Sequence, residues 1–186
     1  MKYDKIIVSG KFAVGTTTLS MRLREILNWK YINAGAIQRE YDRKHGIHEN
    51  KQGALSRSDR HEREIDEMTV KMLQKEKKII YEAWLAGFMA RDIRRVLKVL
   101  LICSNDSVRV DRVVNRENIS VEEAKDWIKQ RERENEIKWH KLYGNHNFWD
   151  PKHYDLVIDT YASGPMETVG KVLDKLGFKG TLNHKR

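Results

Sequence analysis

The segment from Gly10 to Thr17 combines residue types at a spacing that suits phosphate binding. It reads Gly-Lys-Phe-Ala-Val-Gly-Thr-Thr, so Gly10 and Gly15 match the two glycines of the phosphate-loop pattern G-x-x-x-x-G-K-[ST]. In that pattern, backbone N–H groups and the lysine bind phosphates, and the last hydroxyl binds Mg²⁺. Thr17 supplies the hydroxyl, but Thr16 stands where the lysine is expected. The segment therefore predicts a nucleotide phosphate site without its usual lysine.

Two further polar segments directly follow predicted strands. Asn33–Gly35 follows the strand 30–32 and leads into a helix that carries Arg39, and Glu82 ends the strand 78–82. Because ligands bind at the carboxyl ends of parallel strands, we expect both segments to lie beside the glycine loop. Glu82 either orients a metal-bound water or a ligand hydroxyl, or it caps the helix that follows.

A second group of candidate residues is cationic and lies on two predicted helices. Phosphoryl transfer depends on positioning and electrostatic stabilisation, for which the planar guanidinium group of arginine is well suited. Glutamates are interleaved with these arginines, so the alternative is an ordinary solvated helix surface. The residues are Arg109, Arg112 and Arg116 on the first helix and Arg131 and Arg133 on the second, with Lys138 following them.

Aromatic residues are concentrated near the end of the second of these helices. They are Trp139, Tyr143, Phe148 and Trp149. A nucleobase could stack there, since an aromatic face accepts any base, but ordinary packing is the simpler interpretation.

Helical and strand patterns alternate along the chain, which favours an α/β fold with a parallel sheet. Short apolar runs predict strands at 5–9, 30–32, 78–82, 97–103 and 155–159. Amphipathic periodicity predicts helices at 17–28, 35–45, 58–77, 105–116, 121–142 and 165–176. Since the glycine loop joins the first strand to the first helix, the positive end of that helix would face a bound phosphate. Ser120 and Glu123 predict a capping box at the start of another helix.

Composition restricts the class of protein. The chain has 186 residues, enough for one domain with its own core, and 36 Lys and Arg against 27 Asp and Glu give a net charge of +9. A basic chain suits a phosphate-rich ligand or nucleic acid. Cys103 is the only cysteine, and no apolar stretch reaches the length of a membrane helix. We therefore expect a cytoplasmic protein with neither an internal disulfide nor a membrane partner.

The order of these motifs resembles the archaeal-type cytidylate kinases, which are small members of the P-loop nucleoside monophosphate kinase family. The resemblance covers about residues 5–172, nearly the whole chain. Its more specific parts are Arg112–Ala124 and Tyr154–Thr160. The other segments that carry it are Ile6–Gly10, Tyr31–Gly35, Arg39–Glu40, Glu82 and Leu85–Gly87.

This resemblance implies a fold, an activity and cofactors. The implied fold is a P-loop NTPase domain over 1–176, with three α/β/α layers and a five-stranded parallel sheet flanked by helices. A monophosphate-binding arm would span 35–77, a helical lid would span 112–145, and a polar, frayed tail would span 177–186. The implied activity is transfer of the γ-phosphoryl group of ATP to CMP or dCMP, so we expect ATP and Mg²⁺ as cofactors and a nucleotide as substrate.

The resemblance also implies roles for individual residues. The expected ATP-binding residues are Gly10, Val14, Gly15, Thr16, Thr17 and Thr18, with Thr17 also binding Mg²⁺. The expected acceptor-binding residues are Gly35, Arg39, Glu82, Trp84 and Arg131. The expected catalytic residues are Arg112, Arg116 and Lys11. Some P-loop ATPases use a lysine at the position of Lys11, which here could contact a phosphate of its own site, reach the nucleotide of a partner subunit, or simply be solvated.

Four residues depart from the family pattern, namely Thr16, Asn33, Trp84 and Lys138. Thr16 replaces the loop lysine, and Trp84 replaces an arginine that would bind the acceptor. Each lost charge-assisted contact costs about 1.5–3 kcal/mol, so two or three losses could silence the reaction. The alternative function is therefore a catalytically weakened or inactive nucleotide-binding protein with a regulatory or RNA-associated role. The sequence leaves open whether the chain is a monomer or a dimer.

Overall fold

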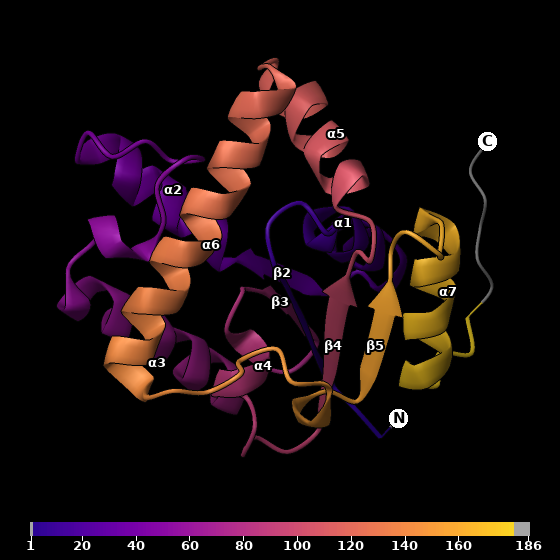
Figure 1. Cartoon of the computed structure of the whole chain (residues 1–186). Helices are drawn as coiled ribbons and strands as arrows, with labels where there is room; N and C mark the ends of the chain where they lie inside the picture. Colours follow the sequence, from indigo (N-terminus) through magenta and orange to yellow (C-terminus); the bar gives the residue numbers. More distant parts are fainter. Residues whose placement is uncertain (1, 181–186) are drawn as a thin grey trace.

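Five parallel strands form a single sheet in the computed structural model, which describes residues 2–180 (Figure 1). The strands are β1 (Lys5–Gly10), β2 (Lys30–Asn33), β3 (Ile79–Glu82), β4 (Val96–Ile102) and β5 (Leu156–Asp159). Their order is β2-β3-β1-β4-β5, which places β1 in the middle of the sheet. Because every pairing is parallel, the five carboxyl ends lie along one edge of the sheet.

Helices cover both faces of this sheet. Within residues 2–180 they are α1 (Thr16–Leu27), α2 (Ala34–Lys44), η1 (Ala54–Ser56), α3 (Asp59–Lys75), α4 (Ala86–Met89), α5 (Asp106–Glu117), α6 (Val121–Tyr143), η2 (Pro151–His153) and α7 (Pro165–Leu176). On β1, Ile6 and Val8 pack with α1 and α7, whereas Ile7 packs with α3 and α4 on the opposite face. Neighbouring strand residues point to opposite faces, so a strand that is apolar throughout needs helices on both sides. The predicted three-layer α/β/α fold is confirmed.

The predicted strands and helices differ from the observed ones by one or two residues at their ends. The capping box is confirmed, because Ser120 accepts from the Glu123 N–H and the Glu123 carboxylate accepts from the Ser120 N–H. The elements that the sequence did not reveal are α4, η1 and η2, each too short to display a period. Of the predicted polar tail, 177–180 follows α7, while 181–186 lies outside the described residues.

α5 and α6 form a hairpin beyond the carboxyl edge of the sheet. Figure 1 shows this hairpin above β4 and β5, with α6 running back toward α2 and α3. The hairpin occupies most of the predicted lid region, and the segment from α2 to α3 corresponds to the predicted arm. These two parts flank the glycine loop that follows β1.

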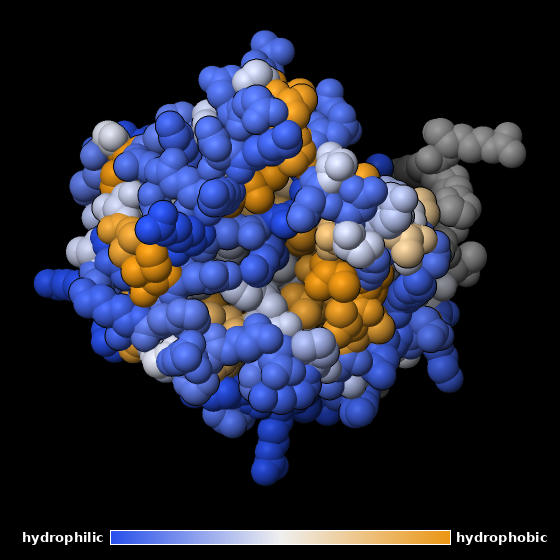
Figure 2. Space-filling view, in the orientation of Figure 1, coloured by the Kyte–Doolittle hydropathy of each residue, from blue (hydrophilic) through white to orange (hydrophobic). Residues whose placement is uncertain are grey.

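The surface is mostly hydrophilic, as expected for a chain in which 34% of residues are charged. Figure 2 shows several separate hydrophobic areas on this face, and one of them lies over β4 and β5, which include the exposed residues Ile102 and Val157. Among the helices of residues 2–180, none combines the length and the apolar character that crossing a membrane requires.

Candidate functional site

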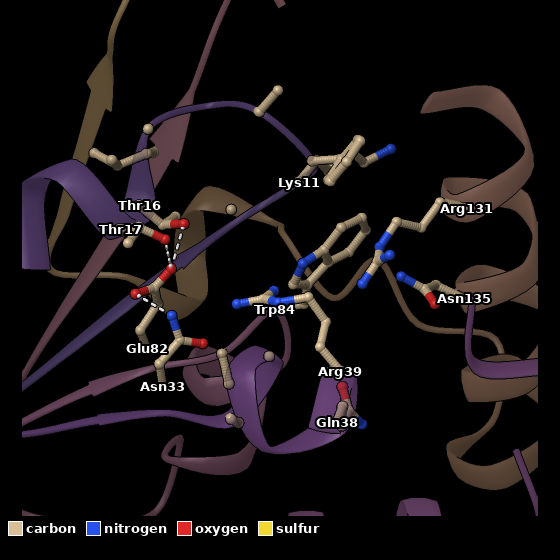
Figure 3. Close-up of a pocket in the computed structure, with 18 of the residues that line it drawn as sticks. Lys11, Thr16, Thr17, Asn33, Gln38, Arg39, Glu82, Trp84, Arg131 and Asn135 are labelled. Atoms are coloured by element: carbon tan, nitrogen blue, oxygen red, sulfur yellow. Dashed lines mark hydrogen bonds between the residues drawn. The ribbon is translucent and has the colours of Figure 1, made fainter. Parts of the chain in front are cut away.

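A cavity of about 680 Å³ lies at the carboxyl ends of the strands (Figure 3). Its lining comes from the glycine loop, the ends of β2 and β3, the arm helices α2 and α3, and the hairpin of α5 and α6. This volume lies within the range of about 300–1,000 Å³ that small-molecule sites usually have. The position matches the edge where open α/β sheets bind ligands.

The glycine loop has a tight conformation that two glycines make possible. A Cβ atom on Gly10 would lie 2.5 Å from Val14 Cγ2 and 2.7 Å from the Leu101 carbonyl oxygen, so only glycine fits there. Gly15 has a φ of 99° and immediately precedes α1, which receives no side-chain cap. The first N–H groups of α1 are therefore left for another acceptor, and the helix dipole favours an anion.

Glu82 is the centre of a hydrogen-bond network beside this loop. Its Oε1 atom accepts from Thr16 Oγ1 at 2.8 Å and from Thr17 Oγ1 at 2.7 Å. Its Oε2 atom accepts from the Tyr31 hydroxyl and, at 3.0 Å, from Asn33 Nδ2. The carboxylate is 7% exposed and ties the ends of β2 and β3 to the start of α1. This network fixes the orientation of the Thr17 hydroxyl.

The network also settles two questions about its members. Glu82 does not cap the next helix, because α4 has no side-chain cap, so that alternative was wrong. Burial and the adjacent Glu82 carboxylate raise the pKa of Tyr31 well above its ordinary value, so the phenol remains a donor. Thr16, at the position of the missing lysine, directs its hydroxyl at Glu82.

Three arginines that line the cavity have no carboxylate partner among the described residues. They are Arg39 on α2, Arg112 on α5 and Arg131 on α6. By contrast, the buried Arg57, which also lines the cavity, forms ion pairs with two carboxylates. Uncompensated guanidinium groups from three separate elements therefore gather around one space. Such a space favours an anionic ligand.

Arg131 has the least compensated environment of the three. Only 5% of the residue is exposed, its Nη1 donates to the Glu49 carbonyl oxygen at 2.5 Å, and its guanidinium lies 5.2 Å from the Phe12 ring centroid. Its Nε atom is buried and has no hydrogen-bond partner within 2–180. Burial, together with the charges of Arg57 and Arg39, lowers the pKa of Arg131 to about 10. A bound phosphate would offset this repulsion.

The other cationic candidates are placed differently. Arg112 donates to the Ala13 carbonyl oxygen at 3.0 Å and to Thr160 Oγ1 at 3.1 Å, at the outer edge of the glycine loop. Arg116 also lines the cavity, with its guanidinium 4.9 Å from the Phe12 ring centroid. Both arginines thus lie beside the glycine loop, and their role in clamping a transferring group stays a prediction.

Three basic residues from the same stretch do not face the cavity. Arg109 pairs with Asp106 and Glu132, and Arg133 is exposed. Lys138 donates to the Arg57 carbonyl oxygen at 2.6 Å and to Asp59 at 2.7 Å. Charge alone therefore did not distinguish the cations that line the cavity from those that hold helices together.

Lys11 contacts the hairpin in this structure. Its Nζ atom lies 3.0 Å from Glu136 Oε1 and 3.8 Å from Glu132 Oε2, and it sits 4.9 Å from the Trp149 ring centroid. Lys11 belongs to the glycine loop and lines the same cavity. A role at a phosphate stays a prediction.

Val14 is the one expected ATP-binding residue whose side chain does not line the cavity. It is 3% exposed and packs in the core, while its carbonyl oxygen accepts from Thr160 Oγ1 at 2.9 Å. Gly15 and the three following threonines line the cavity, as does Gly35 at the start of α2.

Trp84 lines the cavity between α2 and α6. Figure 3 shows its indole near Arg39 from α2, with Arg131 and Asn135 pointing toward it from α6. The Trp84 ring makes edge contacts with the rings of Trp139 at 5.9 Å and Trp149 at 6.1 Å. Trp139, Phe148 and Trp149 belong to a packed aromatic cluster. This supports ordinary packing, and not stacking on a nucleobase, as the role of these residues. Trp84 forms an aromatic wall on the side where the resemblance led us to expect an arginine.

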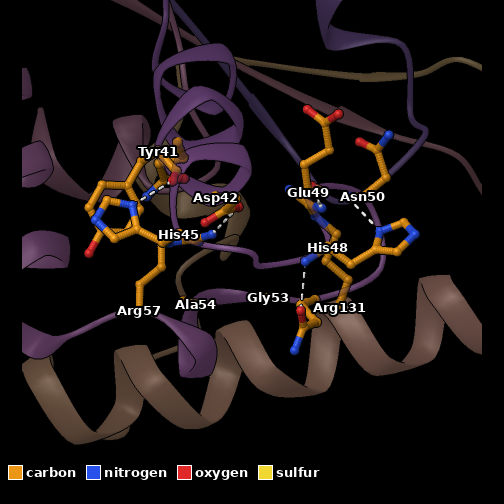
Figure 4. Close-up of polar contacts among 12 residues, drawn as sticks. Tyr41, Asp42, His45, His48, Glu49, Asn50, Gly53, Ala54, Arg57 and Arg131 are labelled. Atoms are coloured by element: carbon orange, nitrogen blue, oxygen red, sulfur yellow. Dashed lines mark hydrogen bonds and ion pairs between the residues drawn. The ribbon is translucent and has the colours of Figure 1, made fainter.

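The arm is joined to α6 by its own loop (Figure 4). The Gly53 N–H donates to Glu134 Oε2 at 2.5 Å, and the Ala54 N–H donates to Asn135 Oδ1 at 2.7 Å. Arg131 donates to a carbonyl oxygen of the same loop. The cavity is therefore bounded by an arm and a hairpin that are in direct contact.

Replacing Gly53 with alanine should destabilise this junction. The new Cβ atom would lie 2.7 Å from Asn135 Oδ1 and 2.8 Å from the Arg131 carbonyl oxygen, closer than packed atoms allow. Overpacking of this kind costs about 1–3 kcal/mol, which denaturant unfolding would measure. Gly170→Ala is the control, because nothing lies within 4 Å of that site in α7 and alanine favours a helix. A Gly53→Ala protein as stable as wild type would mean that the arm does not stay in this position.

Asp66 on α3 is a carboxylate that lines the cavity where α3 contacts α6. Its Oδ2 atom accepts from the Tyr143 hydroxyl at 2.5 Å, across the junction with α6. Burial raises the pKa of Asp66 to about 7, against the smaller lowering effect of the Tyr143 hydrogen bond. The ionised form is therefore disfavoured by the fold.

Asp66→Asn should accordingly stabilise the protein at alkaline pH. Because the folded-state pKa is raised, the contribution of Asp66 to stability is present below its ordinary pKa and is lost as the pH rises through about 7. Relative to wild type, the variant should gain about 2 kcal/mol more in its free energy of unfolding at pH 8.5 than at pH 5.5, or roughly 4–8 °C in melting temperature. Glu67→Gln changes an exposed neighbour and should show no such dependence; an equal gain at both pH values would contradict this account.

Sequence reasoning missed several residues of the site. Tyr31 was noted only as part of a motif, and Asn33 only as the start of a polar segment and as a departure from the family pattern, although their positions at the end of a strand next to Glu82 were a usable signal. Asp66 and Asn135 lie on helices of mixed charge, and no pattern in the sequence distinguished them from solvated neighbours.

Comparisons with known proteins agree with this geometry. The model of the cytidylate kinase-like family matches residues 5–162. The cytidylate kinase of Pyrococcus horikoshii is 34% identical over 194 residues, which cover 100% of this chain and 98% of that protein. The cytidylate kinase of Pyrococcus furiosus is 36% identical over 187 residues, covering 97% and 95%.

Solved structures share the fold at low identity. A gluconokinase from Sinorhizobium meliloti has a TM-score of 0.61 at 14% identity, covering 95% of this chain and 93% of that one. A shikimate kinase from Acinetobacter baumannii has a TM-score of 0.53 at 15% identity, covering 92% of both. Since the family model spans most of the chain and the relatives match it nearly from end to end, this protein belongs to the cytidylate kinase-like family.

Proposed function

We propose that this protein transfers the γ-phosphoryl group of ATP to a nucleoside monophosphate, with CMP or dCMP as the first acceptor to test. The observation that carries this proposal is the set of three arginines, without a carboxylate partner among residues 2–180, around one cavity next to a phosphate-type glycine loop. The transferring group and the acceptor phosphate are both anionic, and a site for them needs cations that are not already neutralised. The names of the relatives suggest the acceptor.

The donor side of the cavity fits the phosphates of ATP. The tight turn at Gly10 and the uncapped start of α1 present backbone N–H groups, and the Thr17 hydroxyl is held in place by Glu82. No cluster of three or more His, Cys, Asp or Glu ligands occurs within residues 2–180. Mg²⁺ would therefore be held by the Thr17 hydroxyl, phosphate oxygens and water. Glu82 would orient one of these water molecules, since bound Mg²⁺ often keeps several waters. Mg-ATP supplies the transferable phosphoryl group and neutralises part of its charge.

The acceptor side fits a phosphate joined to an aromatic ring. Arg39 and Arg131 approach from opposite sides and would grip the phosphate, as planar guanidinium groups do. Trp84 and Trp139 offer an apolar wall for the base. Arg112 and Arg116, at the loop, would then stabilise the group in transfer between the two sides.

The alternative, a silenced nucleotide-binding protein, is less well supported. The threonine at the lysine position is a member of an ordered network around Glu82. The arginine that Trp84 replaces has a counterpart in Arg131, which is buried and aimed into the same space. Arg131 therefore offers a cation where Trp84 removes one, and Thr16 is an ordered part of the site.

The proposed function is tested by incubating the protein with Mg-ATP and a panel of CMP, dCMP, UMP, AMP and GMP. Chromatography should reveal ADP and a nucleoside diphosphate in equal amounts for at least one pyrimidine acceptor. If ADP forms at the same rate without any acceptor, or if no acceptor is phosphorylated, the proposal is wrong.

Arg131→Gln and Arg133→Gln form a matched pair for the acceptor site. Both remove one positive charge from α6, but Arg131 is buried at the cavity whereas Arg133 is exposed. We expect Arg131→Gln to raise KM for the acceptor about tenfold, because a charge-assisted contact is lost, and Arg133→Gln to leave it unchanged. Equal effects of the two variants would show that the charge acts at long range and not by contact.

A further inference from the structure

Basic residues are concentrated at the amino edge of the sheet, which lies opposite the cavity. This edge consists of the residues that begin or directly precede β1 to β4, namely 4–5, Lys30, 75–78 and 91–95. They include eight basic and three acidic residues, an excess of five positive charges in a chain whose net charge is +9. In Figure 1 the edge lies on the side of the N-terminus, away from the arrowheads. Nucleotide binding in the cavity therefore does not account for this charge.

Backbone hydrogen bonds hold four of these positions in one row. The Lys30 N–H donates to the Lys78 carbonyl oxygen at 2.9 Å, and the Lys78 N–H donates to the Asp4 carbonyl oxygen at 2.7 Å. The Asp4 N–H donates to the Arg95 carbonyl oxygen at 3.1 Å. The row thus crosses β2, β3, β1 and β4, which are neighbours in the sheet. Three strand spacings of about 4.8 Å give it a length of about 14 Å.

Two residues of this row have a strained backbone. Lys78 has a φ of 53° and Arg95 has a φ of 63°. This left-handed conformation suits glycine, whereas a residue with a Cβ atom adopts it at a cost. Strain of this kind often occurs at functional positions, where the surrounding structure enforces it. The edge therefore presents a basic side chain at two positions where glycine would be less strained.

Several cations of the edge are not neutralised by the protein. Arg95 pairs with Asp4, and Lys30 pairs with Glu76. Four exposed cations form no ion pair with any residue of 2–180, namely Lys75, Lys77, Lys78 and Arg94. Lys75 lies in the last turn of α3, where the helix dipole stabilises a cation. The other three lie in the connections that lead into β3 and β4, where no helix end explains their charge.

A second, smaller cavity adjoins the edge at Arg91. Its volume is about 320 Å³, and its lining includes the ring of His146, which lies 5.2 Å from the ring of Phe88. The other charged or imidazole side chains of this lining are Asp150, Lys152 and His153. Histidine rings can stack on unpaired bases. The cationic edge therefore continues into a hollow that could receive one base.

We propose that the amino edge binds the phosphate backbone of a single-stranded nucleic acid, with one base in the adjoining cavity. A row of about 14 Å meets about four phosphates at a spacing of about 3.4 Å along a strand. A single strand is favoured over a duplex because an unpaired base can enter the second cavity. The surface leaves the first cavity free, so this inference is independent of the proposed function.

Fluorescence anisotropy with a short labelled RNA tests this inference, with DNA of the same sequence in parallel because both carry the phosphate backbone. Wild type should bind with a dissociation constant of about 1–100 µM at physiological salt. The logarithm of the association constant should fall with the logarithm of the salt concentration at a slope of about −3, as expected for four phosphates. A preference for RNA or for DNA would support the proposal and identify the strand that is bound.

Two triple variants distinguish the amino edge from general positive charge. The first combines Lys77→Gln, Lys78→Gln and Arg94→Gln. It should bind at least about tenfold more weakly, with a salt slope that is smaller by about 2. The matched control combines Lys125→Gln, Lys129→Gln and Arg133→Gln, which remove the same charges from exposed positions of α6 and should leave binding nearly unchanged. Melting temperatures check that both variants fold, and the single variants Lys77→Gln and Arg94→Gln replace a triple variant that does not.

Four results would overturn this inference. The first is a wild type that binds neither strand at low salt, and the second is equal binding by the two triple variants. The third is displacement of the strand by saturating Mg-ATP and CMP, which would place it in the first cavity. The fourth is competition by polyglutamate as effective as that by unlabelled RNA, which would make the edge a surface for an acidic protein.

Discussion

Replacing Glu82 with glutamine is expected to lower the rate of phosphoryl transfer by at least about a hundredfold. The carboxylate accepts from two threonines through one oxygen and from Tyr31 and Asn33 through the other. Glutamine keeps one acceptor oxygen but places an amino group where the second one was, so two of these donors would face another donor. The Thr17 hydroxyl would then lose its fixed orientation next to the site proposed for Mg²⁺.

The dependence of the rate on Mg²⁺ distinguishes this role from simple loss of stability. Glu82→Gln should require more Mg²⁺ for half-maximal activity, while its melting temperature reports any general damage. Glu76→Gln is a suitable control, because Glu76 is a solvent-exposed carboxylate that pairs with Lys30. If Glu82→Gln transfers phosphate within threefold of wild type, Glu82 holds the fold together and has no part in catalysis.

The sequence indicated the residues at the glycine-loop end of the cavity better than those at the end between the arm and α6. Thr16 and Thr17 follow the glycines within a few residues, so a local pattern contains them. Their contact with Glu82 depends on the placement of β3 beside β1, with Val8 opposite Glu82. Strand order is a property of the whole sheet, and spacing along the chain does not contain it.

The end of the cavity between the arm and α6 depends on which faces of two helices meet. Arg131 and Arg133 are two residues apart on a helix of mixed charge, yet one is buried at the cavity and the other is exposed. The turn at Gly53 selects the buried face, because the backbone of the arm approaches α6 closely there and donates to Glu134. Tertiary contacts determine which residues of α6 are buried at the cavity, so the charge pattern of α6 alone could not predict them.

Thr16→Lys, which restores the usual residue of the phosphate-loop pattern, is expected to lower activity. The Thr16 hydroxyl lies 2.8 Å from Glu82 Oε1, so an ammonium group at this position would have the buried carboxylate as its nearest anion. An ion pair there would compete with the phosphates for the lysine and would displace Thr17 from the same oxygen. The loss of one charge-assisted contact corresponds to about ten- to a hundredfold in rate.

A double-mutant cycle identifies the cause of that loss. If the new lysine acts by pairing with Glu82, Thr16→Lys should do less harm in a protein that already carries Glu82→Gln, since contacting residues give non-additive effects. Met21→Lys adds the same charge to an exposed position of α1 and should leave kcat unchanged. A Thr16→Lys protein that is faster than wild type would mean that the loop is a weakened version of the usual one. A slower protein with a non-additive cycle would mean that the threonine and Glu82 together form a phosphate site of a different construction.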